Sequence, residues 1–518
     1  MTEKLSSWRA VWLAMRSWRT ASVSLLSFSS GLPLGLVWIA IPAWLARVGV
    51  DIKVIGLFTL AQAPWSFKFL WSPLLDRYRL PLPRLGHKLG WTLFWQVGLL
   101  IVTLLLGGVA THPDAIWLIG VLTLSVAFAS ASQDIAVDAY AVEVLRPEEQ
   151  GVAVGARTAL YRSAMFVSGG AAITLAGLWS WPAVFVLLAV LYAPLMIVTF
   201  FAPRPEVESG RGPASLREAV WLPFVSFLTR ARALEILAFV VLYKLADNLA
   251  GALVRPFLVQ MGFNDFDVGI ATATIGLVAT LVGTFLGGML TTALGLGHAL
   301  WIFGTLQIVS NFGYVLIANV GADRLLMYGA MAFESLTSGM GTGAFGVLLL
   351  RMTQKEFSAT QYALFSSLFA LPRILAGPVT GVTVDAIGWH DFFILTMLVG
   401  IPGMVMLQRF SPLGLRNPDL ERLTAGSNAS VSRRALWLRA IFGGLSGALG
   451  AALVTALLDA LRGMRGAPDR GFDIVTPLLG LTAPRSVNEW VAVISILLFG
   501  ALIALASAAT AAARARRE

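Results

Sequence analysis

The chain has 518 residues, of which 57% are hydrophobic and only 13% are charged. Soluble proteins carry about 25% charged residues, and apolar runs of 20 or more residues recur along almost the whole length. This composition excludes a soluble enzyme, a nucleic-acid-binding protein and a secreted disulfide scaffold. The formal net charge of +10 comes from basic residues placed between the apolar runs, and the absence of cysteine excludes thiolate metal sites.

Residues 1–21 carry Arg9, Arg16 and Arg19, with Trp8 and Trp12 at helical spacing. The segment lacks the short apolar region and the cleavage site of a signal peptide. The pattern predicts an amphipathic helix at the cytoplasmic membrane surface, and a merely charged tail is the equally favoured alternative.

Fourteen apolar segments are long enough to cross a bilayer as helices, at ~20 residues for a span. Twelve of them form two groups of six, and two more follow, so we expect an all-α polytopic membrane protein with 14 spans. The predicted spans lie near residues 22–46, 52–74, 88–110, 115–142, 151–177, 182–202, 233–260, 266–293, 297–319, 325–350, 358–387, 390–410, 436–461 and 487–512.

Two polar linkers divide the chain. The predicted domains are an amphipathic segment at 1–21, a six-helix bundle at 22–202, a cytoplasmic linker at 203–232, a second six-helix bundle at 233–410, a linker at 411–434, and two additional helices with a basic tail at 435–518. With the N-terminus inside, 25 of the 38 Lys and Arg residues fall in inner segments and 7 in outer ones. This asymmetry predicts that both termini are cytoplasmic.

The two groups of six spans repeat each other. Gly169, Trp181 and Phe185 recur 208 residues later as Gly377, Trp389 and Phe393, at the junction of the fifth and sixth span of each group. Two six-span repeats joined by a basic connector are typical of the major facilitator arrangement.

Several charges lie inside predicted spans, where each costs ~2.5–3.5 kcal/mol on insertion scales and therefore calls for a function or a partner. With a rise of 1.5 Å per residue, four of them lie near mid-membrane and a fifth, Arg373, slightly nearer the outer side. This mid-membrane group comprises Arg162, Lys244, Asp247, Glu334 and Arg373. It suits binding of an anionic hydrophilic solute, and ion pairing that holds the two halves together is the alternative.

Asp134 and Asp138 are four residues apart on the fourth span and so share one helical face, in its inner half. Lys68 on the second span reaches a similar depth and could neutralise one of them. A carboxylate pair in a low dielectric suits a proton carrier, and a structural ion pair at the cytoplasmic gate is equally favoured. Trp38 and Tyr161 are candidate aromatic contacts for a sugar ring, although interfacial tryptophan belts are commoner.

Segments in both halves resemble the AmpG-type muropeptide permeases of the major facilitator superfamily. The likeness runs in register over roughly residues 20–410. It is carried by residues 30–34 (SGLPL), 67–74 (FKFLWSPL), 76–78 (DRY), 130–135 (SASQDI), 243–247 (YKLAD), 333–334 (FE), 339–342 (GMGT) and 357–361 (FSATQ).

The resemblance implies a proton-driven importer of anhydro-muropeptides (GlcNAc-anhydroMurNAc peptides) in the bacterial inner membrane, working without a metal or other cofactor and without nucleic acid. The lipid bilayer and protons are its other partners, and we expect a monomer. By the resemblance, Asp76 and Arg77 form a latch at the inner gate. The positions that match the family's intramembrane polar motifs are Gln133, Asp134, Asp138, Lys244, Asp247 and Glu334. Carriers of acetyl-CoA or a siderophore, and a membrane receptor that does not transport, are the competing hypotheses.

Overall fold

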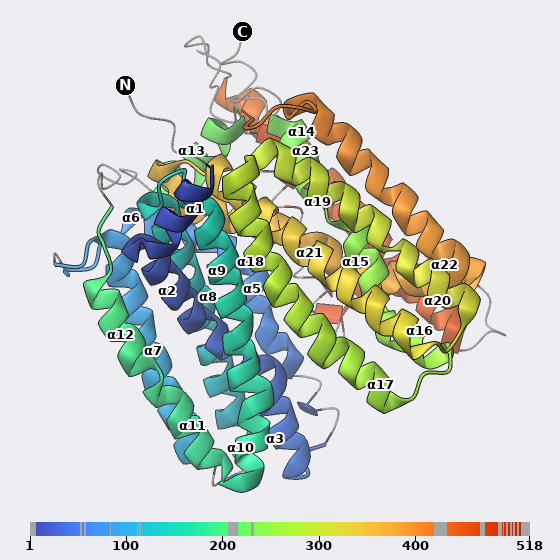
Figure 1. Ribbon diagram of the computed structural model, residues 1–518, viewed down its shortest axis with the longest axis horizontal. Helices are drawn as coiled ribbons and strands as arrows, with labels where there is room; N and C mark the ends of the chain where they lie inside the picture. The colour runs from blue at the N-terminus through green and yellow to red at the C-terminus, as the bar shows by residue number, and fades with distance from the viewer. Residues whose placement is uncertain are drawn as a thin grey trace. The chain divides into compact units, whose positions relative to one another are not determined.

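The computed structural model describes residues 7–51, 54–55, 58–82, 84–110, 112, 115–205, 216–228, 233–418, 432–466, 472–484 and short pieces between 489 and 508. These residues form helices joined by short loops, and no strand occurs among them (Figure 1). Residues up to 219 and from 235 to 420 make one compact unit, which contains the first predicted bundle and all but the first two residues of the second.

The first bundle follows a short helix α1 (Ser7–Arg16). Its helices are α2 (Trp18–Gly35) continuing into α3 (Ile41–Arg47), α5 (Ala63–Phe67) and α6 (Ser72–Arg77), α7 (His87–Val109), α8 (Ile116–Val144), α9 (Gln150–Phe166) continuing into α10 (Ala172–Leu178), and α11 (Trp181–Val190) with α12 (Tyr192–Phe201). Single π-helical turns at Leu36–Ala40 and Val167–Ala171 join α2 to α3 and α9 to α10.

The second bundle is interrupted at different places, among them a π-helical turn at Ile270–Ile275 in its second span. Its helices are α14 (Ala233–Leu242), α15 (Leu245–Ala252) and α16 (Val254–Gln260), α17 (Asp265–Gly269) with α18 (Gly276–Leu294), α19 (Leu296–Ser310) with α20 (Phe312–Val320), α21 (Arg324–Met352), and α22 (Ser358–Phe410). The last of these is two helices that meet at Gly388, whose φ of 77° only glycine adopts readily.

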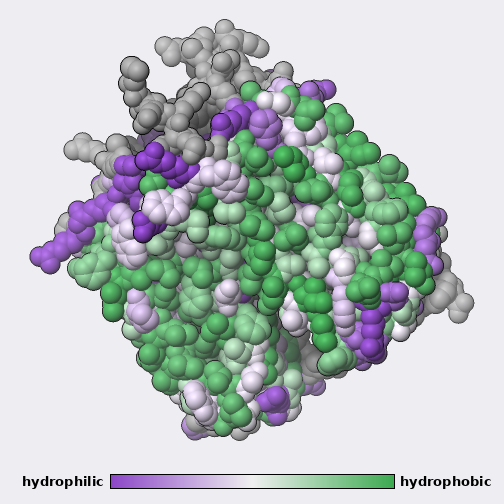
Figure 2. Space-filling view, in the orientation of Figure 1, coloured by the Kyte–Doolittle hydropathy of each residue, from purple (hydrophilic) through white to green (hydrophobic). Residues whose placement is uncertain are grey.

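Nine helices in the described part of the chain are long and apolar enough to cross a membrane. Figure 2 shows the corresponding belt of hydrophobic side chains, with hydrophilic residues gathered at the end of the bundle where α1 and α6 lie. Because a lipid-facing surface must be apolar, the chain is a multi-pass membrane protein. The count of 14 spans stays a prediction, since the last predicted span falls largely outside the described residues.

The second predicted span is not the single helix that we expected at 52–74. A 3-10 turn at Thr59–Gln62, α5, a second 3-10 turn at Lys68–Leu70 and α6 follow one another there. Pro64 and Pro73 each open a new helical segment. Proline has no N–H to donate and its ring clashes with the preceding turn, so a helix restarts at each of them.

The internal repeat predicted from Trp181 and Trp389 is visible in the packing. The ring centroids of Trp181 and Phe185 lie 5.9 Å apart, as do those of Trp389 and Phe393. Each pair packs on an aromatic residue of its own bundle's first span, Trp44 in one and Phe257 in the other. Burial of these rings stabilises the corresponding corner of both bundles.

The two bundles meet along α9 and α18, which lie side by side in the middle of Figure 1. A methyl group added to Gly288 would lie 2.7 Å from the Cα of Gly155, and one added to Gly155 would lie 2.9 Å from the carbonyl oxygen of Phe285. Glycine therefore sets the distance between the bundles at this seam, as small residues do in membrane helix pairs.

The second compact unit comprises residues 220–234 and 421–518. Within it lie α23 (Arg433–Gly466) and α24 (Val475–Thr482). Gly443 and Gly447 of α23 face Ser507 and Ile503, so the chain segments approach closely there, as small residues allow. The predicted domain boundaries stay a prediction.

Candidate transport site

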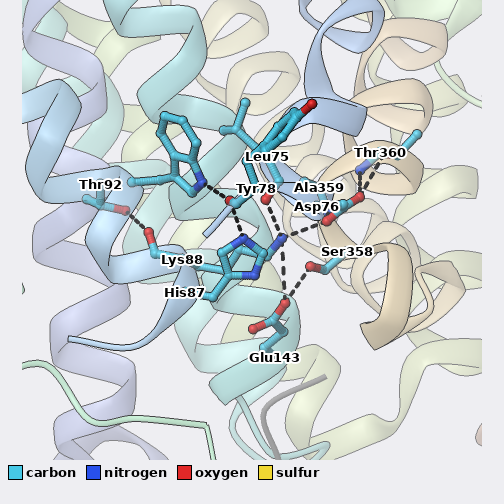
Figure 3. A network of polar contacts seen from close by, with 11 residues as sticks. Leu75, Asp76, Tyr78, His87, Lys88, Thr92, Glu143, Ser358, Ala359 and Thr360 are labelled. Atoms are coloured by element: carbon cyan, nitrogen blue, oxygen red, sulfur yellow. Dashed lines mark hydrogen bonds and ion pairs between the residues drawn. The ribbon is translucent and has the colours of Figure 1, made fainter. Parts of the chain in front are cut away.

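A hydrogen-bonded latch joins the two bundles at the end where α1 lies. Asp76, on α6, accepts hydrogen bonds from the backbone N–H of Ala359 at 3.1 Å, the N–H of Thr360 at 2.8 Å and the Thr360 hydroxyl at 2.7 Å (Figure 3). These N–H groups belong to the first turn of α22, where a helix leaves its donors unsatisfied and attracts negative charge. Asp76 of one bundle thus caps a helix of the other.

A buried lysine supports the latch. The Lys88 ammonium lies 2.6 Å from an Asp76 carboxylate oxygen and 4.0 Å from Glu143, and Glu143 accepts a hydrogen bond of 2.6 Å from Ser358 (Figure 3). The Lys88, Asp76 and Glu143 side chains are all less than 5% exposed. Two contacts between the bundles therefore share one cation, which compensates the burial of two carboxylates.

In the structure, the side chains of Asp76 and Arg77, which the resemblance assigns together to the latch, make different contacts. Asp76 bridges the bundles, whereas the Arg77 guanidinium lies over the ring of Tyr78, 5.4 Å from its centroid. Sequence reasoning missed Lys88 and Glu143, because both stand at the ends of spans, where a charge is ordinarily explained by topology.

A cavity of about 210 Å³ lies between the bundles. Helices of both bundles line it, and three of the predicted charged residues, Asp134, Asp138 and Lys68, share its wall. The other lining residues are Ser27, Ser30, Val154, Arg157, Thr158, Tyr161, Thr342, Phe345, Gly346, Leu349, Tyr362, Ser366 and Phe369.

Two cations surround Asp138 in this first cavity. The Lys68 ammonium lies 3.2 Å from one Asp138 oxygen, and the Arg157 guanidinium is paired with the other. Lys68 also lies 4.0 Å from Asp134, so it is near both carboxylates, where the sequence suggested that it could neutralise one of them. Across the seam, Arg157 lies 6.0 Å from the ring centroid of Tyr362. Asp138 is therefore linked to the second bundle through a single guanidinium.

A second cavity of about 420 Å³ is lined by four of the five mid-membrane charges, Arg162, Lys244, Asp247 and Glu334. The Lys244 ammonium is 2.6 Å from Asp247 and 2.9 Å from the carbonyl oxygen of Ser338, whose hydroxyl donates to Asp247 at 2.6 Å. Arg162 and Glu334 line the same cavity. Lys244 stands where the seventh span breaks between α14 and α15, so the unwound turn directs the charged side chain inward.

The two cavities adjoin, because Thr342 and Phe369 line both. Each is lined by two basic and two acidic residues, Lys68 and Arg157 with Asp134 and Asp138 in the first, Arg162 and Lys244 with Asp247 and Glu334 in the second. The described lining of each cavity therefore has a formal net charge of zero, although it contains several charged side chains. Such walls present both signs of charge to a solute.

Not every predicted contact reaches a cavity. Tyr161 lines the first cavity. Gln133 is fully buried inside the first bundle, where it donates to Ser29 at 2.8 Å, and it lines neither cavity. Trp38 is 37% exposed, packs edge-on against Trp65 and also lines neither. The side chain of Arg373 lies outside the described residues.

Arg157, Ser338 and Tyr362 join the candidate site although sequence reasoning did not select them. Arg157 can be recognised in the sequence as a charge inside a predicted span. It lies five residues before Arg162 in the same span, and a second intramembrane arginine so close to a candidate contact could have been selected as one. Ser338 and Tyr362 are ordinary residues in apolar helices, and only the tertiary packing brings them to the charged groups.

The chain matches the Major Facilitator Superfamily model over residues 23–377. Its fold is similar to that of a bacterial homologue of the iron transporter ferroportin in an outward-facing state, with a TM-score of 0.56 at 14% identity over 75% of this chain and 98% of that one. The chain therefore belongs to the Major Facilitator Superfamily and is a transporter, not an enzyme.

Within that superfamily the similarity is more specific. The chain is 41% identical to the anhydromuropeptide permease of Escherichia coli strain K12 over 391 residues, which cover 75% of this chain and 79% of the relative. It is 30% identical to a Rickettsia felis protein that carries the name AmpG 4, over 76% of this chain and 96% of that one. The chain belongs to the AmpG-type family of permeases.

Proposed function

We propose that the protein imports anhydro-muropeptides, GlcNAc-anhydroMurNAc peptides, across the bacterial inner membrane by proton-coupled alternating access. The named activity of the Escherichia coli relative supports the cargo. Muropeptides carry carboxylates, amides and sugar rings. Guanidinium and ammonium groups, carboxylates and the Tyr161 ring, all present in the two cavities, are chemically suited to them.

The observation that carries the proposal is the charged, adjoining cavity pair between two bundles that are latched together at one end. Placing eight charged side chains within membrane helices is costly and is a mark of a solute or ion pathway. A latch made of hydrogen bonds between the bundles can open without breaking either bundle. Release of Asp76 from α22 would then expose the cavities at the latched end.

Asp138 is the proposed proton carrier, with Lys68 and Arg157 as its partners. Protonation removes the charge that holds both cations, so it weakens the Arg157 link that leads to Tyr362 in the second bundle. Proton uptake and movement of the bundles are coupled in this way. Asp134 shares Lys68 and is the natural recipient of the released ammonium.

The positive-inside asymmetry supports cytoplasmic termini, and we propose on this basis that the latched end faces the cytoplasm. In this orientation the described conformation is closed to the inside. We propose the monomer as the working unit, since both cavities are lined within one chain.

Uptake of radiolabelled anhydro-muropeptide into proteoliposomes with an imposed proton gradient tests the proposal. We expect accumulation that an uncoupler abolishes. Uptake that is insensitive to the uncoupler would contradict the proposed proton coupling. Binding without uptake would indicate a receptor. If the protein took up acetyl-CoA or a siderophore in preference to anhydro-muropeptide in the same assay, that compound would be the cargo instead.

A further inference from the structure

Helix α1 contacts both bundles at the latched end. Val11 and Ala14 are 3% and 2% exposed and form a small apolar cluster with Val152 and Ala293, against which Met289 packs. Val152 lies on α9 of the first bundle, and Ala293 and Met289 lie on α18 of the second. The helix therefore covers the inner end of the seam that α9 and α18 form.

The polar attachments of the α1–α2 junction that the structure describes go to the first bundle. Ser17 donates a hydrogen bond of 2.5 Å to Glu149, and the Trp18 indole donates one of 3.0 Å to the carbonyl oxygen of Phe201. The contact with α18 is apolar. Apolar contacts separate without leaving unpaired polar groups, so α1 can stay with the first bundle when the second moves away.

The opposite face of α1 has the composition of a membrane-surface helix. Trp8, Trp12 and Met15 are 61%, 53% and 51% exposed. Arg9 and Arg16 are also exposed, and the Arg16 guanidinium lies 4.3 Å from the centre of the Trp12 ring. Indole rings favour the headgroup region, and neighbouring arginines favour anionic lipids.

From these two faces we infer that α1 is a clamp of the inner gate and that an anionic lipid surface holds it in place. Its inner face joins α9 to α18, and its outer face binds acidic headgroups. The clamp stabilises the conformation in which the bundles are closed at the latched end. The inference rests on the proposed alternating access, but its test needs neither cargo nor a proton gradient.

Distance measurements across the gate test the clamp. Because the chain has no native cysteine, spin labels at introduced Glu148→Cys and Glu356→Cys report one exposed position on each bundle at the latched end. Double electron–electron resonance in nanodiscs gives the fractions of short and long distances. Val11→Asp places a charge in the clamp cluster and should raise the ratio of long to short distances by roughly fivefold. Leu13→Asp is the matched control when both variants are compared in the same medium, because Leu13 is 44% exposed on the same helix and lies outside the clamp cluster, so the ratio should stay unchanged.

The double variant Arg9→Gln/Arg16→Gln tests whether anionic lipid holds the clamp in place. We expect wild-type protein to show a larger short-distance fraction in nanodiscs that contain phosphatidylglycerol than in pure phosphatidylcholine, and the double variant to lose that difference. Val11→Ser and a chain lacking residues 1–16 replace Val11→Asp if that variant misfolds, as judged by thermal unfolding. Unchanged distances in all three inner-face variants would overturn the clamp, and equal distances in the two lipids would overturn the lipid requirement. If the gate distances change as expected but the protein takes up no anhydro-muropeptide, the proposed function is contradicted and the clamp is not.

Discussion

At the scale of single residues, the protein buries charges in sets that compensate one another. Asp138 is held by Lys68 at 3.2 Å and by Arg157, and Asp247 is held by Lys244 at 2.6 Å. Removing one member leaves an uncompensated charge at depth, whereas removing a matched pair does not. Variants that keep the charge balance therefore separate a transport role from a structural one.

Asp138→Asn should abolish proton-driven accumulation and retain counterflow exchange, because the proposed carrier can no longer titrate. The single variant also leaves Lys68 and Arg157 undercompensated, which should lower the free energy of unfolding by about 3–5 kcal/mol. Adding Lys68→Met should recover much of that stability but not accumulation. Uptake, counterflow and thermal unfolding on the same preparations check this. Equal loss of uptake and counterflow, with poor expression, would indicate a structural ion pair.

Arg162→Ala should weaken cargo binding more than Asp138→Asn does, by about 1.5–3 kcal/mol, because a charged hydrogen-bond donor is lost from the larger cavity. Arg162→Lys keeps the charge and loses the planar pair of donors, so its affinity should fall between wild type and Arg162→Ala. Equilibrium binding of labelled anhydro-muropeptide to purified protein gives these affinities. Unchanged affinity in Arg162→Ala would exclude a substrate contact.

At the scale of elements, the functional geometry depends on where helices are interrupted or closely packed. Lys68 lies in a 3-10 turn and Lys244 at the break between α14 and α15. Asp76 lies in the last turn of α6, a short helix that begins beside Pro73. Each interruption frees the chain to turn a charged side chain toward the space between the bundles.

Asp76→Asn should open the latch more often, because a neutral amide is a weaker acceptor for the first turn of α22 and no longer pairs with Lys88. Helix caps contribute ~0.5–2 kcal/mol, and charge-assisted bonds fall at the upper end. Thr360→Val removes one of the three bonds and should have the smaller effect. Alkylation of a single introduced cysteine at the buried Gln361 measures opening. Equal rates in wild type and Asp76→Asn would contradict the latch.

Gly155→Ala and Gly288→Ala should hinder closure of the seam, since the added methyl groups meet backbone atoms of the facing helix. Both variants should shift the gate towards the open form and slow uptake several-fold. Gly98→Ala is the matched control, because a methyl group there meets no atom within 4 Å. The spin-label pair at Glu148 and Glu356 measures the shift, and a Gly98→Ala effect of the same size would remove the close-packing explanation.

At the scale of the whole molecule, the two cavities and the latch belong to one compact unit that ends at residue 420. The matched region of the Escherichia coli relative spans 391 residues, and the superfamily model ends at 377. Among the residues that the structure describes, none beyond 420 lines either cavity or takes part in the latch contacts given above.

A chain that ends after Leu420 should therefore retain uptake of anhydro-muropeptide within about twofold of wild type, since the described lining of both cavities and the described latch residues all precede that position. Expression and unfolding temperature must be measured alongside, and the transport rate normalised to folded protein. Loss of uptake in a well-folded truncated chain would assign the last predicted spans a role in transport.

The sequence alone was enough for the membrane class, the two repeated bundles, most helix bounds and the family. These follow from apolar length, from positive charge in loops and from extended runs of matching residues, all of which are local properties of the chain. The sequence also singled out Lys68, Asp134, Asp138, Lys244, Asp247 and Glu334, because a charge inside an apolar run is visible without any structure.

Only the tertiary structure decided which charges meet. It divided the intramembrane groups between two cavities, paired Arg157 with Asp138, brought Lys88 and Glu143 to the latch, and kept Gln133 and Trp38 away from both cavities. The second span became a series of short turns because two prolines interrupt it. Partnerships across 70 to 284 residues of chain depend on the packing of whole helices, and no local pattern records which faces those helices present to one another.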